Sequence, residues 1–288
     1  MHRNVVAFLV ALAAALVLVS FSTASSGAAS NALKYHRIIS LSPTVTEDLF
    51  KIGAGKQVVA VDQDSTYPAS APRTSLSGYS PNVEAIAGYH PDLVLISYNP
   101  SGFAGQLRKL GIKVVMEPAA ANLSQVYKQI KGIGTLTGHA GSAASVVSSM
   151  QMRMFHILAS VPNGHRNFRV YHELDPTYYS ATSNTFIGSI YKLFGFKNIA
   201  DAAGASAHTQ YPQLSGEYIV SANPEIIVLA DTICCGQSKT TVAGRPGWKG
   251  INAVVHHRVV GVSDDIASRW GPRIVDFAAA VAKIARQS

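Results

Sequence analysis

Several tyrosine residues of this sequence lie close to the ends of apolar segments. Their chemistry suits the binding of a wide, flat molecule. A tyrosine ring offers a large apolar face together with a hydroxyl group that forms hydrogen bonds. In open parallel sheets, the residues just beyond the carboxyl ends of the strands line the ligand site. The alternative is that these tyrosines only cover the surface. We expect the following aromatic residues to line a shared pocket: Tyr67, Tyr79, Tyr98, Tyr178, Tyr179, Tyr211 and Trp270.

Motifs of known catalytic sites are absent from the sequence. No serine stands in a Gly-x-Ser-x-Gly elbow. The segment at 55–57 lacks the spacing and the Ser or Thr of a phosphate loop, and Gly132 and Gly134 follow a predicted helix where a dinucleotide site needs a strand. We therefore expect a protein without enzymatic activity and without a cofactor. A secreted hydrolase is the alternative, and it would need a nucleophile and base that the sequence does not reveal.

The histidines and cysteines give only a weak indication of a metal site. The ten histidines include no His-x-x-x-His pair, and we expect no resident metal. His172 and Glu173 follow a predicted strand and are the pair that would serve a zinc or manganese receptor, which is a second alternative. Cys234 and Cys235 are adjacent, a spacing that zinc sites do not use. They either close a disulfide within a loop or remain thiols.

The composition is typical of a globular protein that does not bind nucleic acid. The 288 residues are 48% apolar and 14% charged, and the net charge is +8. The basic residues are scattered and form no run of five or more, whereas nucleic-acid binders cluster them.

The amino-terminal segment 1–29 has the pattern of a secretory signal peptide. His2 and Arg3 precede an apolar run at 5–19, and small residues follow, so cleavage after Ala24 or Ala29 fits the pattern. An uncleaved anchor is the alternative, although such a run is short for a membrane span. No cysteine in this segment could carry a lipid. We expect an exported protein, located in the periplasm or at the cell surface.

Two series of strands and helices must position these residues. The first series, expected as one lobe at 35–137, has apolar strands at 37–41, 58–62, 92–97 and 113–116 with helices between them. A long helix at 138–162 should join it to a second lobe at 166–288, with strands at 168–171, 225–230 and 259–262. Strands that alternate with helices indicate parallel sheets. The predicted fold is α/β, with two Rossmann-like lobes joined by a long helix.

The two lobes also resemble each other in sequence. Pro91 follows Glu84 by seven positions, Pro224 follows Glu217 by seven, and an apolar strand comes next in both cases. The two first strands lie 132 positions apart and the two glutamates 133. A repeat of this length indicates a duplicated lobe. Two such sheets that face each other would form one cleft.

Five motifs in order resemble the binding proteins of ABC importers for iron siderophores and cobalamin, and the resemblance covers about residues 36–285. They are RIISLSP at 37–43 followed by Thr46 and Glu47, NVEAI at 82–86 leading to PDLVLI at 91–96, LRKLGIKV at 107–114, RPGW at 245–248 and WGPRIV at 270–275. The resemblance implies the class III periplasmic-binding fold. It also implies a monomer that delivers its ligand to the permease and ATPase subunits of an importer.

The resemblance assigns roles to individual residues. Glu84 and Glu217 match the two glutamates that dock on the permease. Tyr79 and Tyr211 match the positions at which cobalamin-binding members place tryptophans beside the corrin, and Tyr67 and Tyr179 match further positions of the pocket wall. The implied ligand is cobalamin or a related corrinoid. A ferric siderophore, for which Arg269 and Arg273 would supply positive charge, and haem are the alternatives.

Overall fold

The first lobe of the computed structural model, which describes residues 34–287, contains a parallel four-stranded sheet. Its strands are β1 (Ile38–Leu41), β2 (Val58–Val61), β3 (Leu93–Ile96) and β4 (Lys113–Met116), in the order β2-β1-β3-β4. Every residue of β1 and β3 is buried, because helices cover both faces of the sheet. This explains why the strands are continuously apolar instead of alternating.

Short helices connect these strands and begin at recognisable caps. The Ser42 side chain accepts a hydrogen bond from the amide of Val45 at the start of the first helix, which has Pro43 in its first turn. Asn82 caps the second helix in the same way. The helical segments of this lobe are α1 (Pro43–Lys51), η1 (Ala54–Gln57), α2 (Val83–Ala87), η2 (Pro100–Gly102) and α3 (Phe103–Lys109).

The second lobe repeats the topology of the first. Its sheet contains β5 (Arg169–Glu173), β6 (Lys197–Asn198), β7 (Ile226–Leu229) and β8 (Val259–Gly261), all parallel, in the order β6-β5-β7-β8. The central strands of the two sheets pair in matching registers, with Ile38 opposite Leu93 in one and Val170 opposite Ile226 in the other. The predicted repeat is therefore present in the strand order as well as in the sequence.

The second lobe has more short helices than its sequence pattern predicts. The strand β6 and the helices α7, α9, α10 and α11 are too short to produce a clear apolar period. The helical segments are η3 (Asn163–His165), α6 (Phe186–Phe194), α7 (Ala200–Ser206), α8 (Gly216–Ala222), α9 (Lys239–Ala243), η4 (Trp248–Gly250), α10 (Asn252–Val255), α11 (Asp264–Ser268) and α12 (Ile274–Ala285).

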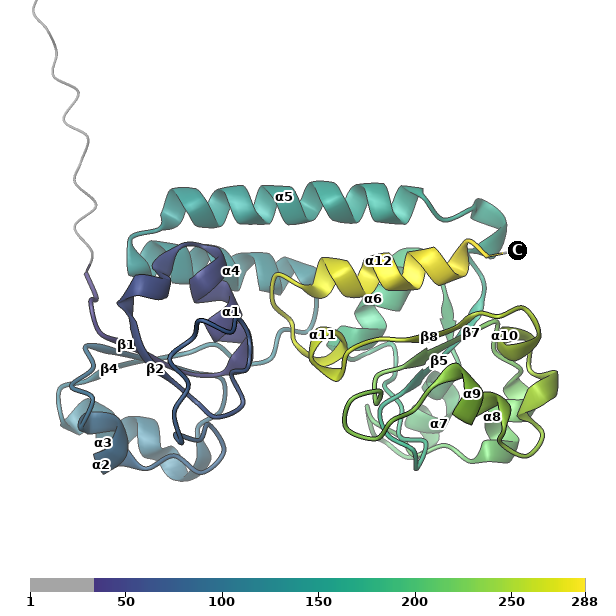
Figure 1. Cartoon of the computed structure of the whole chain (residues 1–288), viewed down its shortest axis with the longest axis horizontal. Helices are drawn as coiled ribbons and strands as arrows, with labels where there is room; N and C mark the ends of the chain where they lie inside the picture. The colour runs from purple at the N-terminus through teal and green to yellow at the C-terminus, as the bar shows by residue number, and fades with distance from the viewer. Residues whose placement is uncertain (1–33, 288) are drawn as a thin grey trace, which may run out of the picture. The chain divides into compact units, whose positions relative to one another are not determined.

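Two long helices lie between the lobes in sequence. Helix α4 (Leu123–Thr137) ends at Gly138, whose φ of 80° suits glycine, and α5 (Ala140–Ala159) begins two residues later. Helix α5 packs against α4 and against α12 (Figure 1). Its buried side chains, including Met150 and Met154, belong to a core that contains residues of both lobes.

The α/β fold with two parallel sheets is confirmed, while two details of the sequence interpretation differ from the structure. Gly132 and Gly134 lie inside α4 and not after a helix. The long helix is shorter than the predicted segment 138–162. The proposed signal peptide lies outside the described residues. Within the described part of the chain, none of the helices combines the length and the apolar character that a bilayer crossing requires.

Candidate functional site

A pocket of about 560 Å³ lies beyond the carboxyl ends of the first lobe's strands. Ser42 follows β1, Asp62 follows β2 and Tyr98 stands two residues after β3, so three neighbouring strands each supply lining residues. The second lobe adds lining residues from α11 and from the segment between α11 and α12, namely Asp265, Ser268, Arg269 and Trp270. This is the strand-end position at which parallel α/β sheets bind ligands.

Two tyrosines form the aromatic part of this pocket. The rings of Tyr79 and Tyr98 have centroids 6.5 Å apart with an interplanar angle of 48°. Their side chains are 74% and 56% exposed, which is unusual for large apolar groups of a globular protein. Together with the half-buried Trp270, they offer aromatic ring surface to a ligand. The structure thus brings together four of the predicted site residues, namely Tyr79, Tyr98, Arg269 and Trp270.

The other four predicted aromatic residues do not line this pocket. Tyr178 stacks on the buried Trp248, with ring centroids 5.7 Å apart, and lines a separate hollow of the second lobe. Tyr179 and Tyr211 are 41% and 48% exposed and lie on loops of the second lobe. Tyr67 lines a different pocket beside α1. In the sequence, all of these residues lie near predicted strand ends. The sequence alone therefore could not show which of them share a pocket.

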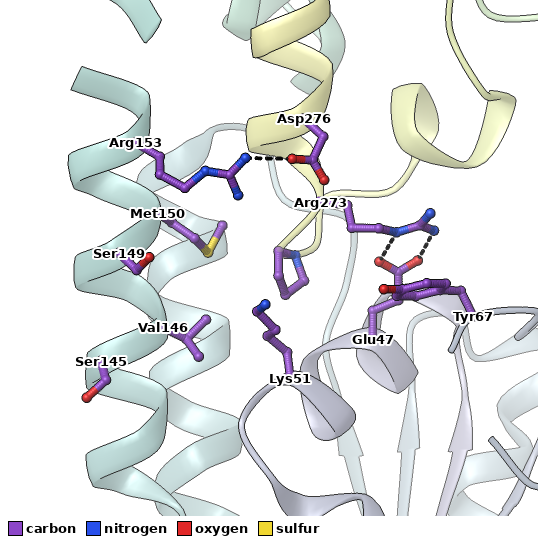
Figure 2. Close-up of a pocket in the computed structure, with 11 residues that line it drawn as sticks. Glu47, Lys51, Tyr67, Ser145, Val146, Ser149, Met150, Arg153, Arg273 and Asp276 are labelled. Atoms are coloured by element: carbon purple, nitrogen blue, oxygen red, sulfur yellow. Dashed lines mark hydrogen bonds and ion pairs between the residues drawn. The ribbon is translucent and has the colours of Figure 1, made fainter. Parts of the chain in front are cut away.

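The pocket that contains Tyr67 has a volume of about 350 Å³ and is lined by α1, α5 and the start of α12 (Figure 2). The guanidinium group of Arg273 lies 4.2 Å from the centre of the Tyr67 ring, a cation–π arrangement. Arg153 of α5 and Asp276 of α12 form an ion pair at 2.7 Å on another side of the pocket. Most of the charged groups of this pocket therefore already form ion pairs with one another.

Glu47 of α1 joins the two lobes through ion pairs. Its carboxylate accepts two hydrogen bonds from Arg273, at 2.8 and 2.5 Å, and one from Arg269 at 3.1 Å. Arg269 also pairs with Asp265 at 2.7 Å and donates to the carbonyl oxygen of Asp64 at 3.0 Å. We call Glu47, Arg269 and Arg273 the interlobe clamp. The hydrogen bonds to Glu47 raise the pKa of Arg273, so the guanidinium group of Arg273 stays charged.

The clamp changes what Arg269 and Arg273 can do for a ligand. Both guanidinium groups are satisfied by carboxylates of the protein, so neither is a free positive charge. The sequence offered them as partners for an anionic siderophore. The structure instead gives them a bridging role, because a carboxylate buried at position 47 requires compensation.

The remaining charged groups at the 560 Å³ pocket are acidic. Asp62, Asp64 and Asp265 line it together with the single arginine, Arg269. Burial raises the pKa of Asp62 to about 6, against the hydrogen bond with Ser65 that lowers it, and the charge of Asp64 contributes to the rise. These aspartates were missed at the sequence level, because isolated acidic residues in loops give no periodic or spacing signal.

His172 and Glu173 at the end of β5 do not form a metal site. Neighbouring strand residues point to opposite faces of a sheet. His172 faces the core, where its Nδ1 lies 2.6 Å from the Tyr191 hydroxyl and burial lowers its pKa to about 3. Glu173 instead binds Arg245 through two hydrogen bonds of 2.6 Å. In residues 34–287, no three His, Cys, Asp or Glu side chains gather closely enough to hold a metal ion.

A second buried carboxyl group lies next to Glu173. Asp231 follows β7 by two residues, is fully buried, and has no hydrogen-bond partner for either side-chain oxygen among the described residues. Burial and then the charge of Glu173 raise its pKa to about 7. Further along the same loop, Cys234 and Cys235 are joined by a disulfide, and Asp264 accepts the amide hydrogen of Cys234 at 2.9 Å.

Glu84 and Glu217 occupy equivalent places in the two lobes. Each is the second residue of a short helix, α2 or α8, behind an Asn82 or Ser215 cap, and both side chains are exposed. A carboxylate in the first helical turn is favoured by the helix dipole. That local effect explains why glutamate is stable there, and it leaves both carboxylates available to a partner.

Comparisons with known proteins identify the family. The periplasmic binding protein family matches residues 38–266. An uncharacterized ABC transporter substrate-binding lipoprotein of Bacillus subtilis is 33% identical over 249 residues, which cover 83% of this chain and 76% of that protein. A cobalamin-binding protein of Halobacterium salinarum is 34% identical over 249 residues, 83% of this chain and 66% of that protein, so the match spans slightly less than two thirds of this relative.

Solved structures agree with this fold. A possible iron-binding periplasmic solute-binding protein from Staphylococcus epidermidis has a TM-score of 0.72 and 30% identity, covering 87% of this chain and 98% of that one. The periplasmic vitamin B12-binding protein of Vibrio cholerae has a TM-score of 0.70 at 22% identity, covering 88% and 99%, and here the likeness concerns the fold alone. The chain therefore belongs to the periplasmic binding protein family, a family of solute-binding transport proteins of ABC importers and not an enzyme class.

Proposed function

We propose that this protein captures cobalamin or a related corrinoid outside the cytoplasmic membrane and delivers it to an ABC importer. The observation that carries the proposal is the 560 Å³ pocket with the exposed rings of Tyr79 and Tyr98 and the half-buried ring of Trp270. Flat aromatic surface suits the apolar faces of a corrin ring. The relative from Halobacterium salinarum, which is named a cobalamin-binding protein, supports the same ligand.

The charges of the pocket favour a corrinoid over the anionic alternatives. Three aspartates and one arginine line it, and Asp265 and Glu47 already neutralise that arginine. A catecholate or carboxylate siderophore, or haem with its propionates, would bring negative charge to a pocket that has no free cation among its lining residues. Cobalamin and its amide-bearing relatives carry little or no net negative charge on the corrin ring. They therefore meet no such repulsion.

Delivery rests on the two exposed glutamates, one in each lobe. We infer that Glu84 and Glu217 dock on basic groups of the permease, and that the protein acts as a monomer so that both carboxylates remain accessible. Their equivalent places on α2 and α8 support a symmetric docking on two permease subunits. Charge pairs of this kind fix the register of a complex and raise its association rate.

Calorimetric titration of the purified protein with cyanocobalamin, haem and a ferric catecholate siderophore, run in parallel, tests the ligand. We expect saturable one-to-one binding of cyanocobalamin and weaker or no binding of the other two. Tight binding of haem or of the siderophore with no heat from cyanocobalamin would reject the corrinoid and retain the transport role. Zinc or manganese retained after dialysis at one ion per chain would favour a metal-ion receptor.

A further inference from the structure

The acidic side of the 560 Å³ pocket carries a carboxyl group whose hydrogen-bonding capacity is not fully used. Asp62 lines the pocket directly after β2 and is only 2% exposed. Its Oδ1 atom accepts no hydrogen bond within the part of the chain that the structure describes. A buried carboxylate oxygen without a donor is costly, and most buried polar atoms in proteins are paired. Asp62 is therefore a position at which a donor from outside the protein would be favourable.

Residue 78 is a glycine and therefore places no side chain against the second carboxyl oxygen of Asp62, Oδ2. Gly78 lines the same pocket, and a Cβ atom there would lie 3.2 Å from Oδ2 of Asp62 and 2.7 Å from the carbonyl oxygen of Leu41. Any residue other than glycine would crowd this approach. The nearest lining cation, Arg269, is bound to Glu47, to Asp265 and to the carbonyl oxygen of Asp64.

We propose that Asp62 is a specificity-determining residue that accepts a hydrogen bond from an amide or ammonium group on the edge of the ligand. This proposal rests on the proposed function and names the part of a corrinoid that the protein reads, namely its amide-bearing periphery. An amide donor would satisfy the orphaned oxygen. A carboxylate at the same place would put two negative charges side by side beside Asp64, with no cation free to compensate.

The size of the effect follows from the burial of the group. Sites that hydrogen-bond a substrate group through buried polar atoms reject analogues that lack the donor far more strongly than apolar pockets do. We expect the protein to prefer an amide-bearing corrinoid over the corresponding carboxylic acid by at least about a hundredfold, or about 2.7 kcal/mol.

The experiment compares two probes with one corrin framework. Dicyanocobinamide carries amides around the ring, and dicyanocobyrinic acid carries carboxylic acids in their place. Titrations at pH 7.5 are run with the unaltered protein, with Asp62→Asn, and with Asp201→Asn, which removes a negative charge on exposed α7 outside the pocket. We expect the preference for the amide to fall at least tenfold in Asp62→Asn and to stay unchanged in Asp201→Asn.

The possible results separate the two proposals. If the unaltered protein binds both probes equally, the role of Asp62 is rejected while corrinoid binding stands. This comparison needs no variant, so it can still reject the role of Asp62 if Asp62→Asn does not fold. An equal loss of preference in both variants would point to overall charge and would also reject Asp62. If neither probe nor cyanocobalamin binds, the proposed function itself fails, and the role of Asp62 fails with it.

Discussion

At the scale of single residues, Asp231 combines full burial with a carboxyl group that titrates near neutral pH. Its pKa rises from 3.8 to about 7 because of burial and because Glu173 lies nearby. The folded protein therefore holds this proton more tightly than the unfolded chain does. The contribution of Asp231 to stability falls as the pH rises from about 4 to about 7, and above that range the buried charge is a cost.

Replacing Asp231 with asparagine should remove this cost. We expect Asp231→Asn to be more stable than the unaltered protein by about 2 kcal/mol at pH 8 and nearly equal to it at pH 4, where the aspartic acid is protonated in the folded state and substantially protonated in the unfolded state. Urea unfolding at both pH values measures the difference. His172, whose lowered pKa acts in the opposite direction, is present in both proteins and cancels in the comparison. A constant difference at the two pH values would contradict the assignment.

The two tyrosines that the sequence resemblance assigns to the tryptophan positions of cobalamin-binding proteins provide a second test. Tyr79 lines the 560 Å³ pocket and Tyr211 does not. We expect Tyr79→Ala to weaken corrinoid binding at least tenfold, about 1.4 kcal/mol, because ring contact is lost. Tyr211→Ala should weaken it less. Titration of both variants with cyanocobalamin decides the matter, and equal losses would support the sequence resemblance over the pocket geometry.

A pocket residue could be predicted from the sequence when it closely follows a strand, because the end of the strand then determines its position. Tyr98 follows a central strand, so its position at the cleft edge is a consequence of topology. Tyr178 stands five residues after β5 in a longer loop, and its ring stacks on Trp248 within the second lobe instead of lining this pocket. The clamp could not be predicted, since Glu47 and Arg269 are 222 positions apart and only the folded chain brings them together.

At the scale of elements, α1 and the start of α12 are joined by the interlobe clamp. Glu47 is nearly inaccessible to solvent and contacts two arginines, while the Arg153–Asp276 pair between α5 and α12 is about half exposed. Breaking a buried ion pair by removing one partner leaves a charge without compensation, whereas exposed pairs contribute little. The two pairs should therefore differ strongly in their effect on stability.

We expect Glu47→Gln to lower the free energy of unfolding by about 3 kcal/mol, because Arg269 and Arg273 lose their shared counter-ion. Asp276→Asn is the matched control at the exposed pair, and its effect should stay below about 1 kcal/mol. Chemical denaturation of both variants at pH 7 gives these values. A Glu47→Gln protein as stable as the control would show that the clamp does not hold the lobes.

At the scale of the whole molecule, the duplicated lobes present two equivalent carboxylates and one shared pocket. The equal strand orders explain why Glu84 and Glu217 occupy the same helix position. The sequence predicted this duplication from its regular spacing. It could not predict that the lining of the 560 Å³ pocket comes mainly from the first lobe, because that depends on how the loops of each lobe fold.

Binding and delivery should be separable by mutation. We expect Glu84→Ala combined with Glu217→Ala to leave the affinity for corrinoid within about twofold, since neither residue lines the 560 Å³ pocket, and to reduce corrinoid uptake by cells at least about tenfold. Asp175→Ala combined with Asp201→Ala removes two acidic groups elsewhere on the second lobe and should not reduce uptake. Normal uptake by the glutamate variant would reject the docking role.

The interlobe clamp has a consequence for how a bound molecule leaves. A wide swing of one lobe away from the other would strip the buried carboxylate of Glu47 from both guanidinium groups, at a cost of several kcal/mol. Thermal motion alone would rarely supply that work. The free protein would therefore populate a wide opening only rarely, and unloading would be favoured by a partner whose contacts replace the ion pairs of the clamp.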